Sequence, residues 1–299
     1  MFGLNTRVGK SFFKDAGDKL KVASIFFTMQ GEGPKRGHPA LFVRLSHCSL
    51  SCSWCDAFFE EGDWFTPSEI QELATKEITK YFNGDVPNWA SADNKRQMGF
   101  VITGGEPTLQ DNIKSLLELA EEEYSWTQIE SNGILKPNVP ESTIVVVSPK
   151  CMEKVDISQG FKRYIPTSYM NPNPETLARA NCLKFIVEDQ PDFDSPYQTI
   201  PEWAHIWHSE TGRDIFISPM NIYKREPQKA IEFRNKLKET GYNKSSIEER
   251  SMYDEVVSFW EPGLFDMDAN QRNHEHAARY ALKYGFIFQM QLHLFASFA

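Results

Sequence analysis

The sequence has no hydrophobic run of the length that a membrane-spanning helix needs, which is about 20 consecutive apolar residues. Cysteine is also scarce. Only five are present, three of them clustered, and this is not the pattern of a disulfide framework. Residues 1–21 mix charges with isolated apolar side chains and lack the apolar core of a signal peptide. We therefore expect a cytoplasmic protein that does not contact a membrane.

Positive charge is in deficit as well. The chain has 32 Lys and Arg against 41 Asp and Glu, a net charge of −9. Proteins that grip DNA or RNA usually present a concentrated basic surface, so we expect no direct binding of nucleic acid. With 299 residues and 40% hydrophobic content, the chain is long and apolar enough to bury a core.

The clustered cysteines carry the strongest chemical signal. Cys48, Cys52 and Cys55 have the spacing C-x3-C-x2-C and follow the apolar run 40–45. Three thiolates on one loop can hold three irons of a cubic 4Fe–4S cluster. Such clusters usually have four cysteine ligands, so an open fourth iron indicates a cluster that binds a ligand and does chemistry.

A structural zinc site is the alternative. Cys3His sets bind zinc, and His47 lies beside the first cysteine. However, the sequence contains no second Cys or His pair at zinc spacing, and adjacent residues are awkwardly placed to ligate one tetrahedral ion. The spacing therefore favours the cluster.

A second motif, Thr103-Gly104-Gly105-Glu106-Pro107, follows an apolar stretch that we predict to be a buried strand near Phe100. Glycines at a strand end let the backbone approach a ligand closely, and the Glu106 carboxylate can receive an ammonium group. Alternatively, this is an ordinary strand-to-helix turn with an acidic residue near the helix N-terminus.

Along the chain, strand patterns alternate with helical ones. This alternation predicts an α/β fold with a parallel sheet flanked by helices. Strands are expected at 24–29, 41–45, near Phe100, and at 126–130, 144–148, 183–188 and 215–218, with helices at 67–81 and 112–122. In such folds the functional residues lie at the carboxyl ends of the strands. Three segments interrupt the rhythm, near 83–96, 190–213 and 241–271, and we interpret them as loops or insertions in a single domain spanning 1–299.

The cysteine spacing and the Gly-Gly-Glu-Pro motif together resemble the radical S-adenosylmethionine (SAM) enzymes. Further motifs are similar to the 7-carboxy-7-deazaguanine synthase family within that superfamily: Met29-Gln30-Gly31-Glu32-Gly33, the 37–44 stretch, Cys55-Asp56, Glu130-Ser131-Asn132-Gly133, Ser148-Pro149-Lys150 and Gln291-Leu292-His293. The resemblance implies an incomplete (β/α)6 TIM-like barrel. It also implies conversion of 6-carboxy-5,6,7,8-tetrahydropterin to 7-carboxy-7-deazaguanine with loss of ammonia, a lyase reaction of queuosine and 7-deazaguanine biosynthesis. In that reaction a 5′-deoxyadenosyl radical abstracts hydrogen from the carboxylate-bearing carbon, the ring contracts, and SAM is re-formed.

The resemblance also assigns residues to ligands. For the cluster it gives Cys48, Cys52 and Cys55, and for SAM it gives Trp54, Cys55, Asp56, Gly105, Glu106, Ser148, Lys150, Ser218, Pro219, Met220 and Asn221. For the substrate it gives Met29, Gln30, Gly31, Glu32, Arg44, Thr103, Glu130, His293 and Ala299, the last through the terminal carboxylate. The residue types are suitable, because Arg44 can fork onto a carboxylate and Gln30 and Glu32 can pair with the pterin edge. No residue is singled out as a catalytic acid or base.

One position departs from the family pattern. Where the family has a Thr or Ser whose hydroxyl helps to coordinate Mg2+ beside the substrate carboxylate, this chain has Ala57. A methyl group cannot ligate a hard cation. Mg2+ is then held by substrate oxygens and water, or the ion has been lost. Our hypothesis is that activity persists with a weaker dependence on Mg2+.

The resemblance further implies an electron donor such as flavodoxin, and it allows a homodimer. Two other functions stay open. One is a different radical SAM reaction on another small molecule. The other is a degenerate, non-catalytic scaffold that recruits partners through its inserted segments. The intact cysteines and the 104–107 motif argue against degeneracy, whereas Ala57 and the long interruptions are what that hypothesis would cite.

Overall fold

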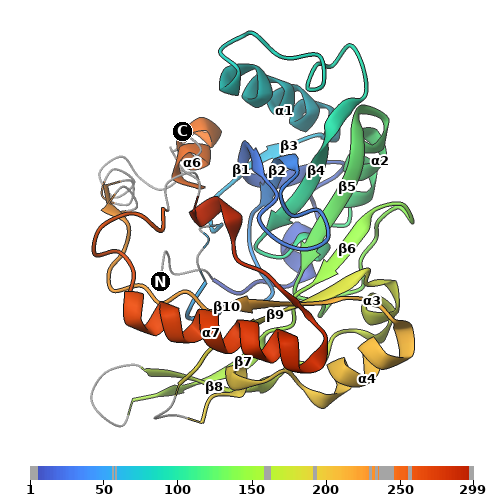
Figure 1. Cartoon of the computed structure of the whole chain (residues 1–299). Coiled ribbons are helices and arrows are strands. Elements are labelled where there is room, and N and C mark those ends of the chain that lie inside the picture. The colour runs from blue at the N-terminus through green and yellow to red at the C-terminus, as the bar shows by residue number, and fades with distance from the viewer. Residues whose placement is uncertain are drawn as a thin grey trace.

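A computed structural model gives the fold. It describes residues 6–55, 57, 59–157, 163–190, 194–228, 231–232, 235, 246–254 and 258–295. Its centre is a nine-stranded sheet in the order β11-β10-β9-β6-β5-β4-β2-β1-β3 (Figure 1). These strands are β1 (Leu20–Met29), β2 (Pro39–Leu45), β3 (Asp63–Phe65), β4 (Arg96–Gly104), β5 (Tyr124–Ser131), β6 (Ile144–Val147), β9 (Cys182–Val187), β10 (Ile215–Pro219) and β11 (Ile287–Phe288). A separate hairpin pairs β7 (Cys151–Asp156) with β8 (Arg163–Tyr169).

The sheet is mostly parallel. Every neighbouring pair from β2 to β11 is parallel, whereas β1 runs antiparallel to both β2 and β3. The strand order does not close, because β3 and β11 are the two edges. The predicted fold class, an α/β fold with an incomplete TIM-like barrel, is confirmed. The antiparallel first strand was not predicted, and it changes where the turn after β1 lies.

Helices cover the outer face of the sheet. They are α1 (Pro67–Tyr81), α2 (Ile113–Glu123), α3 (Pro174–Arg179), α4 (Glu202–Thr211), α6 (Ile247–Asp254) and α7 (Met267–Tyr284), with short 3-10 turns η1 (Lys10–Phe13), η2 (Pro107–Leu109), η3 (Pro196–Gln198) and η5 (Leu292–Leu294). Figure 1 shows α1 and α2 near β4 and β5, and α7 near β10. The predicted helix at 67–81 begins where its sequence specifies. Thr66 and Glu69 form a capping box, and Pro67 occupies the first turn.

Successive side chains of β9 point alternately to the two faces of the sheet. Leu183, Phe185 and Val187 belong to the main hydrophobic core, between the sheet and its helices. The intervening side chains of Lys184 and Ile186 therefore project to the opposite, inner face of the curved sheet. This inner face carries the candidate site.

The predicted strands and both predicted helices are present, with ends shifted by a few residues. We interpreted 190–213 as a loop or an insertion, and residues 202–211 of this segment form the helix α4, so the loop interpretation does not hold for them. The prolines led to the loop interpretation, but Pro201 is the N-cap of this helix and does not interrupt it. Trp207 of the same helix is buried in the main core. Likewise, 241–271 contains α6 and the start of α7, and β4 begins at Arg96. Whether these segments are insertions stays a prediction.

Two further observations concern the chain as a whole. The β5–β6 connection, residues 132–143, contains no helix and is therefore unlike the other crossovers between parallel strands. Among the helices in the described ranges, none combines the length and the apolar content that crossing a membrane requires.

Candidate active site

The cysteine loop begins directly after β2 and is anchored at several points. The backbone N–H and Oγ of Ser53 both donate to the Glu153 carboxylate of β7, at 3.0 and 2.9 Å. The indole N–H of Trp54 donates to the Tyr197 hydroxyl at 3.1 Å. The hairpin and η3 thus hold the loop in addition to its covalent connection to β2.

The loop thiols suit a metal cluster. All three are unbridged, and burial raises the pKa of Cys48 well above its ordinary value and that of Cys52 to about 12. Protonated thiols that are costly to ionise become thiolates when a metal binds, and the metal offsets the cost. The Leu50 N–H already points at Cys48 Sγ, at 3.4 Å. Within the described ranges, no three His, Cys, Asp or Glu side chains are close enough to hold an ion. The fit to a cluster rests on the donor type alone, because three thiols on one short loop are the ligands that iron–sulfur clusters use.

The Gly-Gly-Glu-Pro motif lies directly against this loop. The Gly105 N–H donates to the Leu45 carbonyl at 3.1 Å, and the Glu106 N–H donates to the His47 carbonyl at 2.9 Å. A Cβ at Gly105 would come within 1.8 Å of that His47 oxygen, so only glycine permits the approach. The two motifs that stand about fifty residues apart in the sequence form one unit.

The Glu106 side chain is fully buried and well bonded within the protein. It accepts hydrogen bonds from the Thr108 N–H and hydroxyl, from Ser131 Oγ and from the Asn132 N–H, at 3.1, 2.5, 2.8 and 2.7 Å. These contacts join the end of β4 to the end of β5 and cap η2. The structure thus gives this carboxylate the turn-capping role of the alternative interpretation. Contact with an ammonium group stays a prediction.

The turn after β1 reaches the inner face from an unexpected direction. Met29 pairs with Pro39, the first residue of β2, so the turn leaves at the amino-terminal edge of the parallel strands. Even so, Gln30 Nε2 donates to Glu130 Oε1 on β5 at 3.0 Å. The side-chain oxygen of Gln30, Oε1, accepts from the Glu32 N–H at 3.1 Å. Gln30 therefore joins two of the predicted substrate residues.

Lys184 completes this group. Its ammonium lies 2.6 Å from Glu32 Oε2 and 3.4 Å from Glu130 Oε2, and its side chain is only 8% exposed. Burial would lower the pKa of Lys184, but Glu130 and Glu32 outweigh that effect and raise the pKa above its ordinary value. The lysine is therefore charged at neutral pH.

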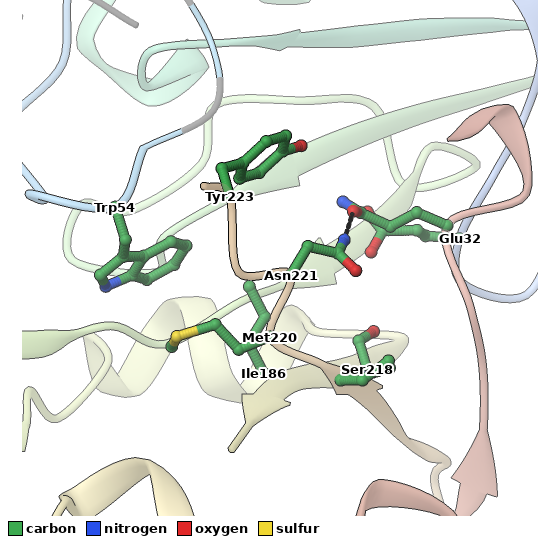
Figure 2. Close-up of a pocket in the computed structure, with 9 residues that line it drawn as sticks. Glu32, Trp54, Ile186, Ser218, Met220, Asn221 and Tyr223 are labelled. Carbon is green, nitrogen blue, oxygen red and sulfur yellow. Dashed lines mark hydrogen bonds between the residues drawn. The ribbon is translucent and has the colours of Figure 1, made fainter. Parts of the chain in front are cut away.

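A pocket brings residues predicted for SAM and for substrate together. It is lined by Glu32, Trp54, Ile186, Ser218, Pro219, Met220, Asn221, Tyr223 and Gln291. In Figure 2, Glu32 and Trp54 lie at opposite sides of the view, with Asn221 and Met220 between them. Asn221 Nδ2 donates to Gln291 Oε1 at 2.6 Å, so the end of β10 is joined to the C-terminal segment.

The remaining predicted residues lie around this centre. Lys150 donates to Ser148 Oγ at 2.6 Å, and its ammonium lies 5.2 Å from the centre of the Trp54 ring. Arg44 and Thr103 are register partners on β2 and β4, and the Arg44 guanidinium lies over the Phe26 ring. The Leu292 N–H donates to the Gly31 carbonyl at 3.5 Å, so the backbone next to His293 adjoins the turn. Asp56, Ala299 and the His293 side chain lie outside the described residues.

Sequence reasoning missed Lys184 and Gln289. Gln289 accepts from the Gly33 N–H and donates to Ser218 Oγ, both at 2.8 Å, and so joins the turn to β10. A signal for Lys184 was present, because it is the only charged residue inside the apolar strand Cys182–Val187. Gln289 had no such signal, since a glutamine that follows a short strand is ordinarily exposed.

Comparisons with known proteins agree with this arrangement. No protein-family model matches the chain. The 7-carboxy-7-deazaguanine synthase of Rickettsia prowazekii is 32% identical over 221 residues, 74% of this chain and 81% of that protein. The enzyme of the same name from Hyperthermus butylicus is 36% identical over 230 residues, 73% of this chain and 84% of that protein. The crystal structure of QueE from Escherichia coli matches with a TM-score of 0.52 and 18% identity, over 96% of this chain and 99% of that one, which supports the fold. The chain belongs to the 7-carboxy-7-deazaguanine synthase family.

Proposed function

We propose that this protein converts 6-carboxy-5,6,7,8-tetrahydropterin to 7-carboxy-7-deazaguanine, with a 4Fe–4S cluster and SAM as cofactors. The observation that carries the proposal is the family relationship, at 32% and 36% identity over nearly three quarters of the chain. The pocket gives it physical support, because Glu32 from the predicted substrate set and Ser218 to Asn221 from the predicted SAM set line one space.

The cluster and SAM, when bound, supply the one-electron reductive chemistry that generates a radical. Cys48, Cys52 and Cys55 are the proposed cluster ligands, on a loop that Ser53 and Trp54 fasten to the hairpin and η3. For SAM, the proposed contacts are the loop residues from Trp54 to Asp56, the Gly105–Glu106 backbone, Ser148 and Lys150, and the end of β10. An electron donor such as flavodoxin completes the proposal.

The substrate side needs acceptors for the N–H edge of the pterin and a cation for its carboxylate. Glu32 and Glu130 are the proposed acceptors, and Arg44 is the proposed cation, since a guanidinium can give a carboxylate two parallel hydrogen bonds. The inner face supports this division, because the two carboxylates lie around one lysine and Arg44 stands beside Thr103 on β2 and β4. Burial excludes water from these groups and strengthens their interactions with a bound ligand.

The test is an anaerobic assay. The protein is purified without oxygen, reconstituted with iron and sulfide, and incubated with SAM, reductant and 6-carboxytetrahydropterin, and products are followed by mass spectrometry. We expect 7-carboxy-7-deazaguanine from the intact chain and none from a variant with Ala at all three loop cysteines. Cleavage of SAM with the pterin untouched would keep the radical chemistry and discard the substrate. A protein that assembles no cluster would contradict the proposal as a whole.

A further inference from the structure

The buried lysine on β9 is not needed to explain the fold. Burying two carboxylates and one ammonium is expensive, and replacing such groups with apolar side chains is often neutral or stabilising. Glu32, Lys184 and Glu130 nevertheless lie together on the inner face, where Ile186 from the same face of β9 lines the pocket. A purely structural account therefore leaves their charges unexplained.

The hydrogen bonds leave one acceptor open. Lys184 donates to Oε2 of Glu32, while Oε1 of the same carboxylate is buried and has no hydrogen-bond partner among the residues that the structure describes. Glu32 is one of the pocket-lining residues, and it lies on the side of the view opposite to Trp54 in Figure 2. An unpaired buried carboxylate oxygen costs stability, so its natural partner is an N–H donor that arrives with a ligand.

Both oxygens of the Glu130 carboxylate already accept hydrogen bonds. Glu130 Oε1 receives Gln30 Nε2 and Gln128 Nε2, at 3.0 and 3.3 Å, and its Oε2 faces Lys184 at 3.4 Å. Within the part of the chain that the structure describes, Lys184 alone donates hydrogen bonds to both carboxylates. Its position sets which oxygen of Glu32 remains available and in what direction.

We propose that Lys184 is a positioning residue of the pterin subsite: it fixes Glu32 and Glu130 as neighbouring charged acceptors and presents Glu32 Oε1 to the amino-substituted N–H edge of the ring. This inference rests on the proposed function and adds to it a residue that determines specificity. It predicts that the lysine sets the preference for a 2-amino ring over one with a carbonyl there, without touching the ligand itself.

The experiment measures binding and turnover in the reconstituted protein with SAM. The probes are 6-carboxypterin, which is fluorescent, and 6-carboxylumazine, in which oxygen replaces the 2-amino group. For Lys184→Met we expect the Kd of 6-carboxypterin and the KM of the tetrahydro substrate to rise about tenfold or more, the loss expected when an acceptor of a charged hydrogen bond is misplaced. The preference for carboxypterin over carboxylumazine should largely disappear, a change that a purely structural role of Lys184 would not cause.

Arg96→Met is the matched control. Arg96 is also buried and paired, with Glu123 and Thr75, but it stands at the first residue of β4, away from the pocket. This variant should lose stability and keep both Kd values. If Lys184→Met does not fold, Lys184→Gln keeps an amide donor and should show a smaller loss of the same preference.

The outcomes separate the two proposals. Wild-type protein that binds carboxypterin and makes product, together with a Lys184→Met protein that keeps its ring preference, overturns the role of Lys184 alone. An equal loss of preference in Arg96→Met would also overturn it, because the effect would then follow from general destabilisation. Wild-type protein that neither binds carboxypterin nor turns over the substrate would contradict the proposed function, and the inference with it.

Discussion

Single residues decide how closely the two sequence motifs approach each other. At Gly105 the chain passes so near to the His47 carbonyl that a methyl group cannot fit. The close approach also lets the Glu106 N–H donate to that carbonyl. This hydrogen bond fixes the cysteine loop against the end of β4. The glycine is therefore required by packing against the loop, independently of any ligand.

Gly105→Ala tests this packing. The backbone must shift to relieve the clash, so we expect the free energy of unfolding to fall by about 2 kcal/mol or more. Iron content after reconstitution should fall as well, because the loop moves. Urea unfolding and iron analysis measure the two effects. Gly9→Ala is the control, since its added Cβ meets only Ser11 Oγ at 3.9 Å, and it should change stability by less than about 0.5 kcal/mol.

Ala57 leads to a prediction about Mg2+. Its side chain is buried and offers no ligand to a cation. We expect turnover to persist when Mg2+ is lowered, and Ala57→Thr, which adds a hydroxyl, to make the rate depend more strongly on the ion. The measurement is rate against Mg2+ concentration for both proteins. An absolute Mg2+ requirement in the unaltered chain would refute the hypothesis.

At the scale of elements, helix α6 is fastened to the antiparallel strand β1. Arg250 donates from Nε to the Ala23 carbonyl and from a terminal nitrogen to Asp63, both at 2.6 Å, and its side chain is only 3% exposed. Ser251 accepts a hydrogen bond from the Ile25 N–H. Part of a segment predicted as loop or insertion therefore supports the strand that delivers Gln30 and Glu32.

Arg250→Met should destabilise the protein by roughly 3 kcal/mol, because it leaves a backbone carbonyl and an aspartate without their buried partner. Arg279→Met is the matched control. Arg279 is 80% exposed, and its ion pair with Glu275 lies on the surface of the same helix, so we expect a change below about 0.5 kcal/mol. Chemical denaturation compares the two. Equal effects would mean that α6 is not a structural support of β1.

The β7–β8 hairpin leads to a prediction about the cluster. Glu153 receives both hydrogen bonds from Ser53, in the middle of the cysteine loop. Glu153→Ala should free the loop, and we expect the reconstituted protein to lose iron to a chelator several-fold faster, as when the support of a metal site is removed. Glu175→Ala, which removes an exposed pair with Lys136, is the control. Iron loss at the wild-type rate in Glu153→Ala would show that the hairpin does not hold the loop.

The strands and the first two helices could be predicted because their signals are local. Apolar runs such as 40–45 and the Thr66–Glu69 cap act within a few residues. Helix α4 was missed because the prolines before it were read as breakers, and β1 was not recognised as antiparallel because strand direction is not encoded in periodicity. For the site, the family motifs supplied the residue lists. The partnership of Lys184 with Glu32 and Glu130 depends on contacts between residues 54 and 152 positions apart, which no local pattern reveals.

For the whole molecule, the central claim is that an incomplete barrel holds a pterin and SAM against one cluster loop. Segments far apart in the sequence take part, since residues 291 and 292 bond to the segment after β10 and to the turn after β1. The arrangement accounts for a reaction in which SAM and substrate must meet within one pocket. That the segments near 83–96, 190–213 and 241–271 are insertions in a single domain stays a prediction.

The most direct test uses substrate deuterated at the carboxylate-bearing carbon. The reconstituted protein is incubated with SAM and reductant, and mass spectrometry follows both 7-carboxy-7-deazaguanine and the deuterium content of SAM. We predict that product forms and that deuterium enters SAM, because the abstracted atom passes through a cofactor that is re-formed. Product formation with unlabelled SAM would contradict hydrogen abstraction at that carbon, and the absence of product would contradict the account itself.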